Sequence, residues 1–353
     1  MEEAHFTSKD TFQRMAKINR DNIQDILALT PMQKGMLFHY LKEPWNDLYV
    51  EQLCLVISGE IERKSFEKAW NFVIETNEML RTTFHWDGLE NPIQIILKKH
   101  PHLPVFVDFS NNSKEEIEQT IASLKNGERK KVLTLQGEIP FYVMLCKVGQ
   151  NRYELIISNH HMLYDGWSNG IILKEFFKTY ADLASTRVPM RPIKTGFKEF
   201  VKYLSKRDNE KEKEYWRNYL IDFETLTQLS IKKRTNVDKM DNMSAKRFYL
   251  TRLEKHEKDN IEDFLKEHKI TAASFFYSVW GILLQRYNNS DDVVFGTSVS
   301  GRPASISGIE NMVGLFINTI PLRIQSNAEE KIIKVIANSK HWEGTGKSPV
   351  TFI

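Results

Sequence analysis

Residues 158–168 of the chain read Ser158-Asn159-His160-His161-Met162-Leu163-Tyr164-Asp165-Gly166-Trp167-Ser168. The alternating apolar run before this stretch, residues 153–157, predicts a strand. Residues 169–177 behind it have the apolar spacing of a helix, which Ser168 would start as its N-cap. The two histidines therefore lie where a strand ends and a helix begins, a position from which side chains reach a cleft.

His160 and His161 are the candidate chemical groups of this stretch. Histidine is the one side chain whose unperturbed pKa lies near neutrality, so it can accept and return a proton there. A pair of hydrogen-bonded structural histidines is the alternative interpretation. Four fixed positions on one strand-to-helix turn, which include Asp165 and Gly166, favour a catalytic site.

The pattern His-His-x-x-x-Asp-Gly resembles the signature of condensation domains of non-ribosomal peptide synthetases, which belong to the chloramphenicol-acetyltransferase-like superfamily. Other stretches resemble further motifs of this family in the family's order, and they are residues 29–39, 77–84, 300–303 and 312–319. In the second of them, Thr76-Asn77 replaces the usual Arg-His before the glutamate. The resemblance covers the chain from about Asn22 to Ile324.

The resemblance implies an α/β (α+β) fold with two chloramphenicol-acetyltransferase-like α/β sandwich halves in a V shape. A proline-containing segment interrupts the helical pattern and predicts a linker. The expected organisation is an N-terminal leader or docking segment (1–28), an N-terminal half (29–184), the linker (185–195) and a C-terminal half (196–353). Spacings of three between Phe12, Met15 and Ile18 suit a short amphipathic helix that orders on binding. The resemblance implies that this segment docks to an upstream synthetase, with a frayed terminus as the alternative.

Periodicity and turn signals predict alternating strands and helices, as in an α/β sandwich. Strands are expected at residues 49–57, 82–86, 93–97, 141–148, 153–158, 247–253 and 292–298. Helices are expected at residues 30–41, 63–77, 114–124, 168–183, 197–204, 211–220, 255–268 and 271–287, the last of them buried. The first helix begins with a capping box, Thr30-Pro31-Met32-Gln33.

Composition restricts the class of protein without naming it. A chain of 353 residues with 41% hydrophobic content can bury a large core and is expected to form two domains. The net charge of +3 is too small for a nucleic-acid footprint, and no apolar run reaches the length of a membrane span or signal peptide. Cys54 and Cys146 have no metal-site spacing and are expected to be buried thiols. We therefore expect a cytoplasmic enzyme that binds no nucleic acid, membrane or metal.

The resemblance also implies a reaction. In this family an upstream aminoacyl or peptidyl thioester is attacked by the amine of a downstream aminoacyl thioester, and an amide forms. Both substrates hang on the phosphopantetheine of partners, the upstream and downstream peptidyl carrier protein domains, while the chain itself binds no cofactor. By this resemblance His161 is the catalytic group in a tunnel between the halves. Proton removal from the amine, orientation of the amine and stabilisation of the tetrahedral intermediate all remain open as its role.

The other signature residues have expected roles as well. Asp165 could orient the imidazole, as in hydrolase triads, but the resemblance implies a structural ion pair with an arginine. Arg302 is the first choice of partner and Arg81 the second. His160 would shape the turn, and Gly166 would allow close backbone approach, with its N–H facing the developing oxyanion.

Three positions are expected to line the tunnel, namely Asn318, Trp167 and Ser168. For Asn318, a loop residue that caps the strand end is an equal alternative.

The chain departs from the family pattern after Asn338, so the second half is expected to be incomplete. A catalytically inactive fragment that acts at most in carrier-protein binding is therefore an alternative function. A related thioester-dependent acyltransferase would share the His-x-x-x-Asp core, but the stretch from Thr30 to Gln33 argues against it. An epimerisation domain shares the histidine pair, whereas the segment after Gly166 favours condensation.

Overall fold

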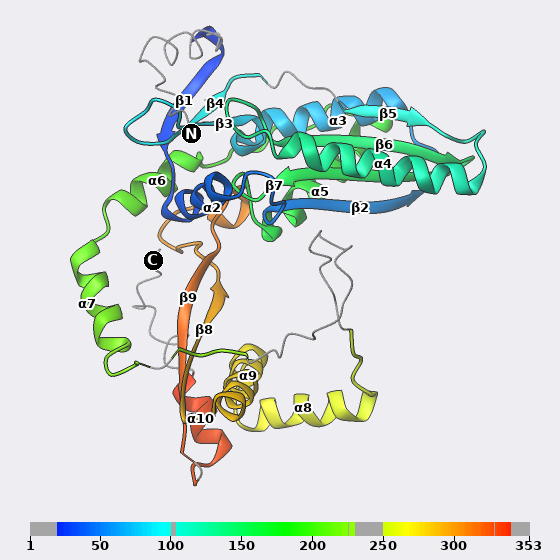
Figure 1. The fold of residues 1–353 in the computed structure, drawn as a ribbon. Coiled ribbons are helices and arrows are strands. Elements are labelled where there is room, and N and C mark those ends of the chain that lie inside the picture. Colours follow the sequence, from blue (N-terminus) through cyan, green and yellow to red (C-terminus); the bar gives the residue numbers. More distant parts are fainter. Residues whose placement is uncertain (1–19, 100–103, 225, 230–249, 328, 340–353) are drawn as a thin grey trace, which may run out of the picture. The chain divides into compact units, whose positions relative to one another are not determined.

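The computed structural model describes residues 20–99, 104–224, 226–229, 250–327 and 329–339. The chain forms two compact units (Figure 1). The N-terminal unit combines Met1–Arg207 with Ser300–Asn318, and the C-terminal unit combines Asp208–Val299 with Thr319–Ile353. The expected linker at residues 185–195 therefore lies inside the N-terminal unit, together with a helix that follows it.

A four-stranded sheet carries the histidine pair. It consists of β2 (Val50–Ser58), β5 (Val105–Asp108), β6 (Phe141–Gly149) and β7 (Arg152–His160). The strand order is β2-β7-β6-β5, and only the β5–β6 pair is parallel. The predicted hairpin of β6 and β7 is confirmed. The short strand β5 was not predicted.

Helices cover both faces of this sheet. Helices α3 (Arg63–Thr76) and α5 (Gly166–Ala184) bury one face, where Trp70 stacks on Phe176 with ring centroids 4.6 Å apart. Helix α4 (Lys114–Val132) lies along β6 and β7 (Figure 1) and buries Ile121 against the other face. Because both faces are covered, β7 is apolar and buried along most of its length.

A second sheet precedes and follows α3 in the chain. Its strands are β1 (Ile23–Ala28), β3 (Thr82–His85) and β4 (Ile93–Leu97), in the order β1-β4-β3. The expected leader at residues 1–28 overlaps β1, which pairs with β4 along its length, so residues 23–28 belong to the folded unit. Residues 1–19, where the docking helix was predicted, lie outside the described residues.

Helix α2 (Pro31–Lys42) begins with the predicted capping box, which is confirmed. Its Gln33 side chain is buried and donates to the carbonyl of Met162 at 3.0 Å, so α2 supports the turn after the histidines. The remaining described elements of this unit are η1 (Arg20–Asn22), η2 (Glu78–Arg81), α6 (Phe197–Ser205) and η3 (Ile309–Asn311).

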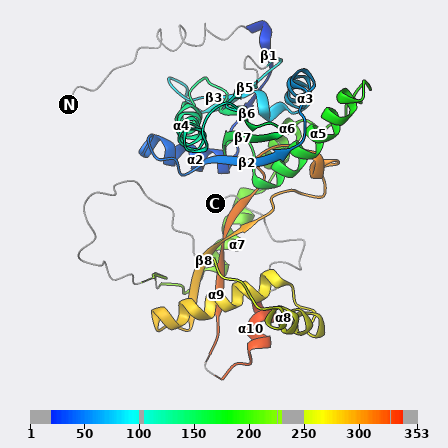
Figure 2. The same cartoon turned by 90° about the vertical axis from the view of Figure 1, so that its right-hand side faces the viewer.

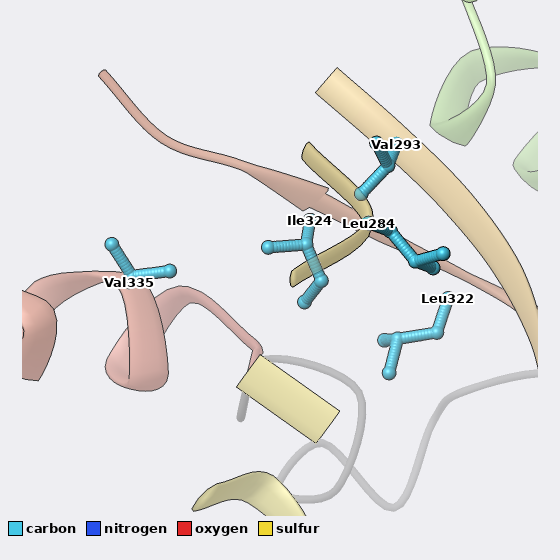
Figure 3. Close-up of a cluster of buried hydrophobic side chains, with 5 residues drawn as sticks. All are labelled: Leu284, Val293, Leu322, Ile324 and Val335. Atoms are coloured by element: carbon cyan, nitrogen blue, oxygen red, sulfur yellow. The ribbon is translucent and has the colours of Figure 1, made fainter. Parts of the chain in front are cut away.

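The C-terminal unit packs helices on a two-stranded sheet. Its described elements are α7 (Asn209–Tyr219), α8 (Lys255–Glu267), α9 (Ala272–Asn288), β8 (Asp292–Val299), β9 (Asn318–Gln325), whose first residue counts with the other unit, and α10 (Ile332–Ser339). Helix α9 contacts β8 and α10 (Figure 2). Figure 3 shows the small core between them, formed by Leu284, Val293, Leu322, Ile324 and Val335.

Some sequence predictions were wrong. The expected strand at residues 247–253 is absent from its described part, residues 250–253, which has no regular structure. Helix α9 is not buried all round, because Phe276 and Tyr287 are more than half exposed. Cys146 is buried as expected, but Cys54 is exposed. In each case the prediction was based on apolar or β-forming residue types. Tertiary packing, and not residue type, decides whether such residues form a strand or become buried.

Within the described ranges, no helix is long and apolar enough to cross a membrane. The same ranges contain no group of three or more His, Cys, Asp or Glu side chains that could hold a metal ion.

Lys194 joins the segment 185–195 to the rest of the N-terminal unit. Its ammonium pairs with the carboxylate of Glu175 on α5 and donates to Asn77 Oδ1 at 2.6 Å. The Asn77 amide in turn donates to Glu175 at 2.9 Å. Burial lowers the pKa of Lys194, while Glu175 acts in the opposite direction. Lys194, which is distant in the sequence, thus holds Asn77, one of the two residues that replace the family's usual Arg-His.

We expect Lys194→Met to lower the free energy of unfolding by about 2 kcal/mol, because the carboxylate of Glu175 loses its positively charged partner. This value lies between those typical of exposed and of buried ion pairs. The exposed Lys174 on the same α5 is the control, and Lys174→Met is expected to change stability by less than about 0.5 kcal/mol. Urea denaturation of both variants tests this, and equal losses would contradict it.

Candidate active site

His161 lies directly after the last residue of β7. Its backbone N–H donates to the carbonyl of Tyr49 at 2.8 Å, which extends the pairing of β7 with β2 by one residue. The side chain is 18% exposed. The imidazole is therefore positioned by a sheet and remains accessible, as a catalytic group must be.

His160 has the opposite environment, because successive strand residues point to opposite faces. Its side chain is buried, and its Nδ1 accepts a hydrogen bond from the Met162 backbone N–H at 3.2 Å. Burial, and secondarily the charge of His161, lower the pKa of His160 to about 3. At neutral pH it is an uncharged residue that fixes the turn.

Asp165 is the N-cap of α5, a place that the sequence analysis gave to Ser168. Its side chain is 1% exposed. One carboxylate oxygen accepts from the Ser168 N–H and hydroxyl, at 3.2 and 3.0 Å. The other accepts from the backbone N–H groups of Phe316 and Ile317, at 3.0 and 3.2 Å. His161 is not among the hydrogen-bond partners of Asp165 in the described structure, which favours a structural role for this carboxylate.

Arg302 provides the cation beside Asp165. Its Nη2 lies 3.4 Å from Asp165 Oδ1, and its Nη1 donates to the carbonyls of Ile309 and Met312. The guanidinium also lies over the ring of Phe316, 4.1 Å from the centroid. Burial lowers the pKa of Arg302, and Asp165 opposes this shift.

Arg81, the second choice of partner, is used elsewhere in the same unit. It donates to the carbonyls of Ile74 and Leu97 and to the side chain of Gln24. The structure therefore brings Arg302, and not Arg81, to Asp165.

Two glycines allow the segment around Phe316 to approach this close. A Cβ on Gly301 would lie 1.9 Å from the Phe316 carbonyl oxygen, and one on Gly314 would lie 2.7 Å from the Phe197 ring. Neither distance is possible for a side-chain carbon. The motifs at residues 300–303 and 312–319 are thus packed against each other and against Asp165 within one unit.

The three residues expected to line a tunnel have different environments. Trp167 is 64% exposed. Ser168 is buried, and its hydroxyl forms hydrogen bonds with Asp165, Arg302 and the backbone of Gly314. Asn318 is buried at the first residue of β9.

Gly166 is the first residue of α5, where backbone N–H groups have no helical acceptor. A Cβ added there would meet no protein atom within 4 Å. Packing within the chain therefore does not require glycine at this position.

Glu51 on β2 is a site residue that the sequence analysis missed. Its Oε1 lies 3.3 Å from His161 Nε2. The strand register places Glu51 opposite Asn159, two residues before His161 on β7. The alternation of β2 indicated a strand, but the partner strand and its register could not be read from the sequence.

Comparison with protein families agrees with this arrangement. The family model for the condensation domain matches residues 23–342. The chain belongs to the condensation domain family. Surfactin synthase subunit 2 of Bacillus subtilis (strain 168) is 35% identical over 312 residues, which are 87% of this chain and 8% of that protein. Gramicidin S synthase 2 of Brevibacillus brevis is 33% identical over 322 residues, 91% of this chain and 7% of that protein.

Solved condensation domains have the same fold. The starter condensation domain of the rhizomide synthetase RzmA matches with a TM-score of 0.69 and 17% identity, over 90% of this chain and 72% of that one. The epimerization domain from the third module of tyrocidine synthetase B matches with a TM-score of 0.71 and 19% identity, over 90% and 71%. The fold alone therefore does not separate condensation from epimerisation.

We expect Asp165→Asn to destabilise the protein by about 3–5 kcal/mol, because Arg302 would remain buried without a counter-charge. His161→Ala removes a partly exposed ring and is expected to change the free energy of unfolding by less than about 1 kcal/mol. Urea denaturation of both variants provides the comparison. Equal stability of the two variants, with activity lost in Asp165→Asn, would instead support an orienting role for the carboxylate.

Proposed function

We propose that this chain is a condensation domain of a non-ribosomal peptide synthetase that forms an amide between two carrier-bound thioesters. The donor is an aminoacyl or peptidyl thioester and the acceptor an aminoacyl thioester. The environment of His161 carries the proposal. It is the accessible imidazole of the signature, whereas His160 is buried and neutral and Asp165 is engaged in structural hydrogen bonds.

The chemistry requires a modest base. The α-amine of an aminoacyl group has a pKa of about 8, so it must lose one proton before it can attack. His161 accepts a proton, the amine nitrogen forms a bond to the thioester carbon, and the carbonyl becomes an oxyanion. When the carbonyl re-forms, the C–S bond breaks. The imidazolium gives its proton to the leaving thiolate. The neutral imidazole then takes the surplus proton of the amide nitrogen and releases it to solvent.

Gly166 is the proposed neighbour of the oxyanion. As the first residue of α5, it lies at the positive end of the helix dipole. The free space around its Cα allows a substrate to approach the backbone. A buried Asp165 fixes this helix end, so the polar groups are oriented before the substrate binds.

The proposed partners are upstream and downstream peptidyl carrier protein domains and other synthetase domains. Their phosphopantetheine arms would carry both substrates, and the chain itself would bind no cofactor. The proposed setting is the cytoplasm. The division into an N-terminal half, residues 29–184, and a C-terminal half, residues 196–353, remains part of this proposal, as does a tunnel lined by Asn318, Trp167 and Ser168. So does a docking role for the first residues of the chain.

His161→Ala is expected to reduce amide formation about a hundred- to ten-thousand-fold without unfolding the protein, since it removes the base. The assay uses one carrier protein loaded as the aminoacyl donor and another as the acceptor, and it detects the product by intact mass. His256→Ala on exposed α8 is the control and should react at the parental rate. Near-normal turnover by His161→Ala would refute the catalytic assignment.

Gly166→Ala is expected to keep the melting temperature but reduce turnover at least about tenfold, because the added methyl group fills space that the substrate needs. Gly170→Ala is a matched control on α5, where an added Cβ also meets no protein atom within 4 Å. Since it replaces a glycine inside a helix, it should raise stability by up to about 1 kcal/mol and leave turnover unchanged. Equal turnover of both variants would exclude close approach at Gly166.

A further inference from the structure

The carboxylate of Glu51 has no role in the mechanism above. Its side chain is 34% exposed, and its Oε1 lies 3.3 Å from the Nε2 of His161. Among the residues that the structure describes, no lysine or arginine pairs with it. A carboxylate beside a catalytic imidazole is therefore available to a cation from outside the chain.

The ring nitrogen of His161 that faces Glu51 is Nε2. The other ring nitrogen, Nδ1, is buried and has no hydrogen-bond partner in the described structure. A group that reaches His161 from solvent therefore meets Nε2, and with it Oε1 of Glu51. An –NH3⁺ group has three donors, and each forms hydrogen bonds of about 2.8 Å, so it can bridge two acceptors at this separation.

Neighbouring polar atoms mark the same place. Glu51 Oε2, Asn159 Nδ2 and His161 Nδ1 are buried side-chain atoms without a hydrogen-bond partner among the described residues. Glu51 and Asn159 are directly opposite each other on β2 and β7, and Asn159 Oδ1 accepts from the Tyr164 hydroxyl at 2.8 Å. Buried polar atoms are normally satisfied, so these three atoms have unused hydrogen-bonding capacity beside Glu51.

We propose that Glu51 binds the α-ammonium group of the acceptor aminoacyl thioester and holds it at His161 Nε2. This inference rests on the proposed function and specifies the form of the acceptor that the site selects. At neutral pH most of the α-amine is charged, since its pKa is about 8. The carboxylate favours this charged acceptor over a hydroxyacyl acceptor of the same shape, which carries no positive charge.

Binding of two acceptor mimics to the full chain tests the proposal. Glycyl-pantetheinamide and glycolyl-pantetheinamide differ only in an ammonium in place of a hydroxyl group. We expect the parental chain to bind the glycyl compound at least about tenfold more tightly, as for loss of one hydrogen bond to a charged group. Glu51→Gln should weaken binding of the glycyl compound about tenfold and change binding of the glycolyl compound less than about twofold. Titration calorimetry measures both constants.

Glu60→Gln, an exposed glutamate shortly after β2, is the matched control and should bind both compounds like the parental chain. Equal weakening of both compounds in Glu51→Gln would mean that Glu51 only positions the imidazole, and the proposal would be wrong. The proposal would also be wrong if the parental chain bound the glycyl compound no more tightly than the glycolyl compound, or bound neither. This comparison needs no variant. Amide formation by the parental chain is measured separately. If that fails while the charge preference holds, the proposed function is refuted and the ammonium site is not.

Discussion

The buried carboxylate of Asp165 is the interaction on which the N-terminal unit depends. A carboxylate that is 1% exposed is tolerated only when its oxygens are hydrogen-bonded and its charge is paired. Here the start of α5, two backbone N–H groups of the segment at residues 316–317 and Arg302 provide these partners. One side chain thereby joins the turn after the histidines to a segment far away in the chain. The motifs at residues 160–166, 300–303 and 312–319 therefore pack together around this carboxylate.

The residues of the signature around Asp165, residues 160–166, are either buried or accessible. His160 and Asp165 are buried, and each accepts hydrogen bonds from backbone N–H groups of the chain. His161 and Gly166 lie beside them and are open to an incoming molecule. The division follows from geometry, because neighbouring residues at a strand end point to opposite faces and a helix begins directly afterwards. The hydrogen bonds of the buried pair thus fix the backbone on which the accessible pair stands.

The carboxylate next to the catalytic histidine candidate is Glu51, from a different strand, and not the aspartate of the signature. Asp165 therefore does not occupy the place beside the imidazole that a triad-like interpretation would give it. The two carboxylates differ in what surrounds them: Asp165 has an arginine and several N–H donors, while Glu51 has only the imidazole among its described ion-pair partners. A paired carboxylate stabilises the fold, whereas one with unused acceptor capacity can bind a positively charged group.

The sequence by itself determined what depends on neighbours a few residues apart. The capping box of α2, the β6–β7 hairpin, helix α3 and the strand-turn-helix around His161 could all be predicted, because periodicity, turns and caps are local. The pairing of Asp165 with Arg302 came from a family resemblance and not from spacing. Only the tertiary structure decided the pairing of β1 with β4, the position of Lys194 against Glu175 and the contact of Glu51 with His161. Each of these joins residues that are distant in the chain, and strand register and packing, which no local pattern encodes, bring them together.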